Sequence, residues 1–187
     1  ETISNAAVLA MPTIYLPNID GVVDAVTDST PLIRRFESEW PARQVRPDQP
    51  ALRFIDSLVL HGPTNADRLH RDDHEAWRAM EALVTEGVVG SLGISNTSAA
   101  QLEELVAFAS VRPRFVQNRC YASRGWDANV RAGCRQHGIT YQGFSLLTAN
   151  GPVVNGREVK GMAARYGVTP AQLIFRFAQQ VGMLPLT

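Results

Sequence analysis

The chain has 187 residues, 45% of them hydrophobic and 19% charged, and its 18 basic side chains balance 18 acidic ones. This balance argues against binding to nucleic acid or to acidic lipid, because neutralising phosphates requires a basic surplus. The apolar fraction is sufficient for a packed core and argues against disorder. No run of about 18 apolar residues is present, so no membrane span is expected.

The opening residues and the cysteines indicate the cellular compartment. The segment ETISNAAVLAMP has neither a basic start nor an uninterrupted apolar stretch, so it is unlike a secretory signal. Two cysteines, Cys120 and Cys134, are too few for a disulfide framework. We expect a cytoplasmic protein with reduced thiols, in which Cys134 is a small buried apolar residue of a helix.

From residue 54 onwards, short apolar runs alternate with helical patterns. Alternation at roughly 25 to 30 residues is typical of right-handed βαβ units and a parallel sheet. Uninterrupted apolar strands favour a sheet that is covered on both faces, so the fold class is α/β. The predicted strands are 54–60, 91–94, 115–117, 139–147 and 184–187. Three predicted helices are 72–86, 127–137 and 159–166. A further helix is capped by Thr97 or Ser98 and ended by Pro113, and the last one starts at Thr169-Pro170.

Residues 1–53 lack this alternation and hold six of the 11 prolines. A strand over residues 7–16 and a short helix at 31–39 are the elements expected there. We therefore divide the chain into a divergent N-terminal arm, residues 1–53, and a regular part, residues 54–187.

The regular part resembles the aldo-keto reductase family. Five ordered blocks match strands four to eight of the (β/α)8 barrel of that family, so the resemblance implies a partial TIM barrel. The blocks are D-S-L-V-L-H-G-P (56–63), E-A-W-R-A-M-E-A-L-V-T-E-G-V-V-G-S-L-G-I-S-N (75–96), R-F-V-Q-N-R-C-Y (114–121), H-G-I-T-Y-Q-G-F-S-L-L-T-A-N (137–150) and Y-G-V-T-P-A-Q-L-I-F-R-F-A-Q-Q (166–180).

The resemblance implies an oxidoreductase that passes hydride from NADP(H) to a carbonyl carbon. His61 matches the family's histidine that orients the carbonyl, at the carboxyl end of a barrel strand where active sites of such barrels gather. Ser95 and Asn96 match the pair that holds the nicotinamide carboxamide, and Gln117 matches the third carboxamide contact. The alternative role of these three residues is to cap a helix and to satisfy the barrel mouth.

The remaining cofactor contacts implied by the resemblance lie near the end of the chain. Phe144 stands where the family usually has a tyrosine that stacks on the nicotinamide, a change that keeps stacking and loses the hydroxyl. Ser145 and Leu147 match positions along the pyrophosphate path. Leu186 and Thr187 match the lysine and serine that hold the 2′-phosphate, so one charged contact is replaced by leucine.

The other part of the family's catalytic tetrad has no match. In the family a tyrosine donates the proton, and a lysine paired with an aspartate lowers the pKa of that tyrosine. Residues 1–53 reproduce none of these motifs, Tyr15 comes too early, and the single lysine, Lys160, falls in a late helix. We therefore expect carbonyl reduction to be impaired.

Three functions follow from these residues. The first is an aldo-keto-reductase-like enzyme acting on a small molecule with NADP(H). The second is a cofactor-independent isomerase, dehydratase or cyclase of a biosynthetic pathway that uses His61 as acid and base. The third is a non-catalytic protein that acts through contacts with other proteins.

A metal site is not predicted. His70 and His74 are four residues apart beside Asp72 and Asp73, but no third-ligand motif accompanies them. We interpret the four residues as the solvated start of a helix.

A complete barrel of this type needs about 250 residues, so a partial barrel would expose strand edges. The N-terminal arm could fill the gap, two copies could associate, or the chain could be part of a longer protein. We favour arm coverage or a homodimer.

Overall fold

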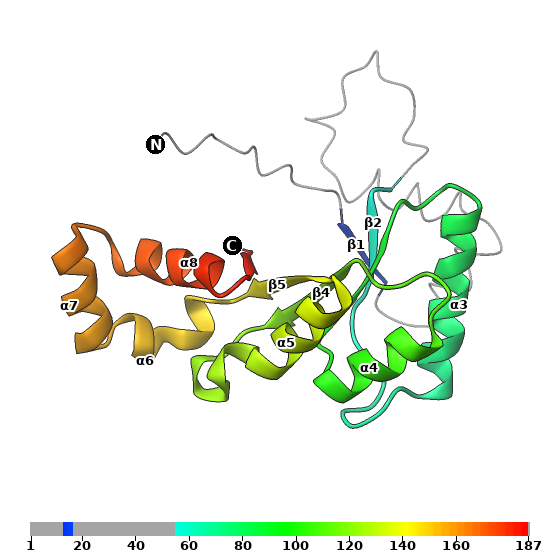
Figure 1. Ribbon diagram of the computed structural model, residues 1–187, viewed down its shortest axis with the longest axis horizontal. Coiled ribbons are helices and arrows are strands. Elements are labelled where there is room, and N and C mark those ends of the chain that lie inside the picture. Colours follow the sequence, from blue (N-terminus) through cyan, green and yellow to red (C-terminus); the bar gives the residue numbers. More distant parts are fainter. Residues whose placement is uncertain (1–12, 17–54, 187) are drawn as a thin grey trace, which may run out of the picture.

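A computed structural model describes the backbone of residues 13–16 and the whole of residues 55–186. The described part holds one parallel sheet whose strands lie side by side in chain order (Figure 1). This arrangement is the one that successive βαβ units build. The strands are β1 (Thr13–Leu16), β2 (Ser57–Leu60), β3 (Leu92–Ser95), β4 (Phe115–Arg119), β5 (Thr140–Phe144) and β6 (Leu184–Pro185).

From β2 onwards, helices connect the strands and follow the curve of the sheet in an arc (Figure 1). Two short 3-10 segments, η1 (Ala122–Asp127) and η2 (Thr148–Asn150), lie in the loops after β4 and β5. The helices are α3 (Arg71–Thr85), α4 (Ala99–Phe108), α5 (Ala128–His137), α6 (Gly151–Val154), α7 (Arg157–Tyr166) and α8 (Pro170–Gln180).

The main hydrophobic core lies between one face of the sheet and the helices. Side chains alternate between the two faces of a strand, and Ile94, Val116 and Tyr141 are direct neighbours across β3, β4 and β5 on the face that the helices cover. Trp77 of α3 is fully buried in this core. The other face carries Val59 and polar residues that lead to the strand ends.

Local capping signals explain where several helices begin. His70, Ser98 and Thr169 each accept a hydrogen bond from a backbone N–H of the first turn, and each capping box is complete. Of the two predicted caps for α4, Ser98 is the one used. The predicted helix 72–86 is confirmed within one residue at each end, and the structure gives His70 a capping role.

The predicted strand 139–147 is too long. The observed strand β5 ends at Phe144, because Ser145 has a left-handed φ of 57° that breaks the pleat. The buried amide of Asn150 then holds the following loop, donating to the carbonyl oxygens of Cys120 (2.8 Å) and Leu146 (3.0 Å). Sequence reasoning had no signal for α6 or for the two 3-10 segments.

The N-terminal predictions are tested only in part. Of the strand predicted over residues 7–16, the part Thr13–Leu16 is present as β1, which pairs in parallel with β2, and residues 7–12 lie outside the described residues. The helix predicted at 31–39 lies outside the described residues, and the boundary between residues 53 and 54 stays a prediction. Among the described helices none is long and apolar enough to cross a membrane. Residues 55–186 also contain no group of three or more metal-ligating side chains.

Gly93 tests the close packing of the sheet. A Cβ atom at this position would lie 3.0 Å from the carbonyl oxygen of Phe115 and 3.1 Å from a methyl group of Val59. We expect Gly93→Ala to lower the free energy of unfolding by about 1–3 kcal/mol. Gly161→Ala is the control: it lies in α7 with nothing within 4 Å, so it should stabilise by about 1 kcal/mol. Urea denaturation measures both, and equal midpoints would contradict this packing.

The cysteines are expected to be unreactive in the folded protein. Cys120 and Cys134 are buried free thiols, as predicted for Cys134. Burial raises the pKa of Cys134 to about 12, and it also raises the pKa of Cys120. Because only the thiolate reacts, iodoacetamide at about pH 8.5 should leave both residues unmodified in native protein and modify both in urea. Mass spectrometry of tryptic peptides reads the result, and rapid native labelling of Cys134 would contradict it.

Candidate functional site

The carboxyl ends of the parallel strands meet at one edge of the sheet and bring polar side chains together. Ser95, Gln117 and Gln142 are register partners on three adjacent strands, and we call them the polar row. The Ser95 hydroxyl donates to the Gln117 carbonyl oxygen at 2.6 Å, and the Gln117 amide donates to the Gln142 side chain at 3.0 Å. Ser95 and Gln117 are buried. Continuing the register of β2 by one residue sets His61 beside Ser95.

His61 and Asn96 stand at the exposed end of this row. Asn96 has a left-handed φ of 50°, which turns the chain away from β3 immediately after Ser95. Its side-chain amide donates to the carbonyl oxygen of His61 at 2.7 Å. Both side chains are exposed, so they are accessible to a ligand at the strand ends.

Phe144, Ser145 and Leu147 lie around a separate hollow of about 370 Å³ beyond β5. Phe175 of α8 and Leu186 complete the apolar part of its wall. The Phe144 ring is half-buried. The hollow therefore suits a flat apolar ring better than a phosphate, since no basic side chain lines it within the described residues.

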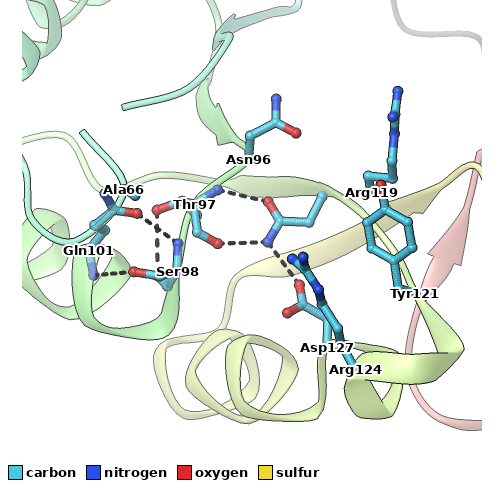
Figure 2. Close-up of a pocket in the computed structure, with 10 residues that line it drawn as sticks. Ala66, Asn96, Thr97, Ser98, Gln101, Arg119, Tyr121, Arg124 and Asp127 are labelled. Atoms are coloured by element: carbon cyan, nitrogen blue, oxygen red, sulfur yellow. Dashed lines mark hydrogen bonds between the residues drawn. The ribbon is translucent and has the colours of Figure 1, made fainter. Parts of the chain in front are cut away.

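A larger cavity of about 460 Å³ opens next to Asn96 (Figure 2). Thr97, Ser98 and Gln101 form one side of it, whereas Arg119 and Tyr121 form the opposite side. The loop before α5 closes the cavity below and adds Arg124 and Asp127.

Asn118 fixes the backbone at the wall of the larger cavity. Its side-chain oxygen accepts from the Thr97 N–H at 3.0 Å, and its amide donates to the Thr97 carbonyl oxygen at 2.7 Å. Asn118 and Thr97 are both buried. One side chain thus replaces a missing strand partner and holds the residue that follows Asn96.

Asp127 and Tyr141 support Asn118 from the helix layer. One carboxylate oxygen of Asp127 accepts from the Asn118 amide and from the Tyr141 hydroxyl, each at 2.8 Å. Burial, together with the negative charge of Asp127, raises the pKa of Tyr141 far above its usual value. Tyr141 therefore stays protonated as a hydrogen-bond donor and is unsuited to act as a catalytic acid.

The predicted site residues therefore fall into two groups. The structure brings His61, Ser95, Asn96 and Gln117 together, and it gathers Phe144, Ser145 and Leu147 at the second hollow. Sequence reasoning missed six residues that either hold these groups in place or line the cavity beside Asn96. One signal was available in the sequence: the polar pair Asn118-Arg119 directly follows Gln117, in a strand that begins with the apolar residues Phe115 and Val116. The missed residues are Asn118, Arg119, Arg124, Asp127, Tyr141 and Gln142.

Comparison with protein families identifies the class. The sequence profile of the aldo/keto reductase family matches residues 48–156, which is more than half of the chain. The chain belongs to the aldo/keto reductase family.

Curated relatives agree with this family. The chain is 31% identical over 150 residues to aldo-keto reductase family 1 member A1 of Sus scrofa and 29% identical to that of Homo sapiens. Each match covers 75% of this chain and 44% of the relative. The chain thus spans less than half the length of these relatives.

Solved structures confirm the fold. An aldo/keto reductase from Brucella melitensis superposes with a TM-score of 0.72 at 22% identity, covering 93% of this chain and 59% of that one. A Bombyx mori aldo-keto reductase solved in complex with NADP has a TM-score of 0.67 at 21% identity, covering 94% of this chain and 57% of that one. The predicted partial (β/α)8 barrel is therefore confirmed.

Asn118 offers a test of how the strand ends are held. Asn118→Leu keeps the volume but leaves the buried N–H and carbonyl groups of Thr97 without partners, so we expect a loss of about 2–4 kcal/mol in unfolding free energy. Asn129→Leu, on the exposed side of α5, is the matched control and should change stability by less than about 0.5 kcal/mol. Urea denaturation followed by circular dichroism compares the two. Similar midpoints would show that Asn118 does not hold this loop.

Proposed function

We propose that the chain belongs to the NADP(H)-dependent carbonyl reductases and binds the nicotinamide end of the dinucleotide at the carboxyl ends of β3, β4 and β5. Two observations support this proposal most directly: the exposed Asn96 amide at the end of the polar row, and the aromatic hollow at Phe144, two residues beyond Gln142 on β5. An amide with a free carbonyl oxygen and an aromatic platform are the two features that a carboxamide-bearing ring requires.

The described residues fit the nicotinamide end of this cofactor better than its phosphate end. The amide oxygen of Asn96 can accept a hydrogen bond, and the Phe144 ring offers a face for stacking. Leu186 brings no charge to the proposed 2′-phosphate position. We therefore infer a weak site that distinguishes little between NADPH and NADH.

The dinucleotide supplies the hydride when it is bound, and the chain must bind and orient the carbonyl. In this proposal His61 orients the carbonyl oxygen, since the Asn96 bond to the His61 carbonyl holds its backbone at the mouth. Two described candidates for the proton donor are badly placed: Tyr141 is buried in the helix layer, and Lys160 lies exposed on α7. We infer slow carbonyl reduction for this reason.

A second candidate function rests on the exposed position of His61. An accessible imidazole at a barrel mouth can transfer protons without a dinucleotide, as an isomerase, dehydratase or cyclase requires. This alternative predicts activity that depends on His61 and is independent of nicotinamide.

The open edges of the sheet bear on the assembly. Within the described residues β1 pairs only with β2, and β6 pairs only with β5. Pairing of such an edge with a second copy is part of this proposal. A monomer mass in light scattering would contradict this pairing, and coverage of the sheet edge by the N-terminal arm would then be the remaining proposal.

Fluorescence titration with NADPH tests the main proposal. We expect saturable binding to the 187-residue chain. We expect about tenfold weaker binding for Asn96→Gly, which removes the amide but tolerates the positive φ. Asn155→Gly is the control, because Asn155 lies outside both hollows. The absence of saturable binding, or equal affinity for Asn96→Gly, would contradict the proposal.

His61→Ala then separates the remaining functions. In the reductase the variant should slow NADPH oxidation with an aldehyde and leave NADPH affinity within about threefold, because His61 contacts the substrate in this proposal. Product formation that depends on His61 without any nicotinamide would favour the acid–base enzyme. If the chain neither binds the dinucleotide nor shows turnover that depends on His61, the remaining function is that of a non-catalytic interaction protein.

A further inference from the structure

The exposed large apolar side chains of residues 55–186 all lie in the last third of the chain. They are Val153, Met162, Tyr166, Val168 and Leu184, so none belongs to α3, α4 or α5. Met162 is 51% exposed and Tyr166 is 61% exposed, and both lie on α7, at the end of the arc of helices farthest from α3 (Figure 1). The two side chains are four residues apart and therefore neighbours on the helix surface. Apolar side chains gathered on one exposed surface favour contact with another molecule.

One side of α7 forms a hollow of about 380 Å³, and we call the residues that line it the α7 face. Their spacing is that of one side of an α-helix, and all of them are exposed. The backbone is open to close approach at the centre, because a Cβ atom at Gly161 would have nothing within 4 Å. The α7 face consists of Arg157, Glu158, Gly161, Met162, Arg165 and Tyr166.

The α7 face carries opposite charges at its two ends. Glu158 belongs to the first turn of α7 and Arg165 to the last turn, so each charge suits the helix dipole at its end. The two residues are separated by about 10.5 Å along the helix axis, which is too far for an ion pair within one copy. Among the described residues, Arg157, Glu158 and Arg165 form no ion pair, and the Cζ atom of Arg165 lies 5.4 Å from the centre of the Tyr166 ring.

This arrangement is complementary to itself when a second copy packs in the antiparallel direction. The midpoint between Glu158 and Arg165 falls between Gly161 and Met162, so a two-fold axis at that point superposes the face on itself. Glu158 of each copy then faces Arg165 of the other copy, and the two Met162 side chains meet at the centre. A parallel arrangement would set like charges against each other. The charges therefore select the antiparallel pair.

We propose that the α7 face is the interface of a homodimer, in which the α7 helices of two copies of this chain pack antiparallel. Met162 and Tyr166 supply the apolar contact, and the two reciprocal ion pairs set the orientation, because exposed ion pairs contribute little affinity by themselves. One side of a three-turn helix offers less area than the standard interface of about 1,600 Å², so the dimer is weak, with a micromolar or higher Kd. The surface is separate from the sheet edges at β1 and β6, and the inference does not depend on a cofactor.

Charge reversal tests the ion pairs. Sedimentation velocity of the full chain over about 5–500 µM should show a monomer that becomes a dimer as the concentration rises. Glu158→Arg and Arg165→Glu should each weaken the dimer at least about tenfold, since each sets like charges opposite each other at both pairs. An equimolar mixture of these two variants should restore the dimer, because each copy then carries the charges that the other requires. Lys160→Glu is the matched control: this residue lies on α7 outside the α7 face, so the reversal should leave the Kd unchanged.

Cross-linking tests the orientation of the two helices. Met162→Cys places the new thiols at the proposed two-fold axis, so a short bis-maleimide should link two chains into a covalent dimer. Lys160→Cys is the control and should remain unlinked. Cys120 and Cys134 are buried, so they should not contribute to the product. Thermal unfolding confirms that each variant is folded.

The possible outcomes distinguish this interface from pairing of the sheet edges. A monomer mass at every concentration overturns the α7 interface. A dimer that keeps its affinity in Glu158→Arg and is not linked through Met162→Cys assigns association to the sheet edges and also overturns it. Loss of the dimer in both single variants, with recovery in the mixture and linkage through Met162→Cys, supports the α7 interface whatever the result of the NADPH titration.

Discussion

The pair of hydrogen bonds between Asn118 and the backbone of Thr97 holds the functional edge of this sheet together. β3 ends at Ser95, level with Gln117, whereas β4 continues to Arg119, and the chain after Asn96 must turn into α4. Without a partner, the N–H and carbonyl groups of Thr97 would be buried and unsatisfied, a cost of about 1–3 kcal/mol for each group. Asn118 supplies both bonds from the neighbouring strand and so sets where Asn96 stands.

The parallel register then arranges the site in layers. Ser95, Gln117 and Gln142 form one row across three strands, and Arg119 and Phe144 form the next row towards the mouth. Ser95 and Gln117 of the lower row are buried, and hydrogen bonds join the row from strand to strand, so it serves as a rigid base. The upper row is more accessible and is the one that a ligand meets first. Rigid support below an accessible layer is the arrangement that orients a substrate with little entropic cost.

Much of the α/β architecture could be predicted because its signals are local. Apolar runs identified β2 to β6, and the residues Ser98, Thr169 and Gly167 marked helix ends through their own backbone chemistry. The end of β5 was predicted three residues too late, because the run from Ile139 to Leu147 stays apolar or small, while the turn depends on the φ of Ser145. Apolar pattern cannot detect that dihedral angle.

The supporting residues of the site could not be predicted, because their roles depend on pairs that are distant in sequence. Asn118 meets Thr97 across 21 positions, and Tyr141 meets Asp127 across 14. Each of these residues, taken alone, is an ordinary polar or aromatic residue of a strand or loop. The family resemblance pointed to Gln117 and passed over Asn118 and Arg119, the two residues that follow it. These two side chains face opposite sides of the sheet, and only the register shows what each one contacts.

Charge shows the same dependence on three-dimensional placement. Equal numbers of acidic and basic residues argue against a partner that is attracted by the net charge of the whole molecule, such as nucleic acid. They do not describe a single cavity, where a few groups within several ångströms dominate. Arg68, Arg71 and Arg78 each find a carboxylate on the outer helices, whereas Arg119 and Arg124 find aromatic rings at the strand ends. The arginines that lie near the proposed cofactor site are therefore among the described arginines whose charge no carboxylate pairs.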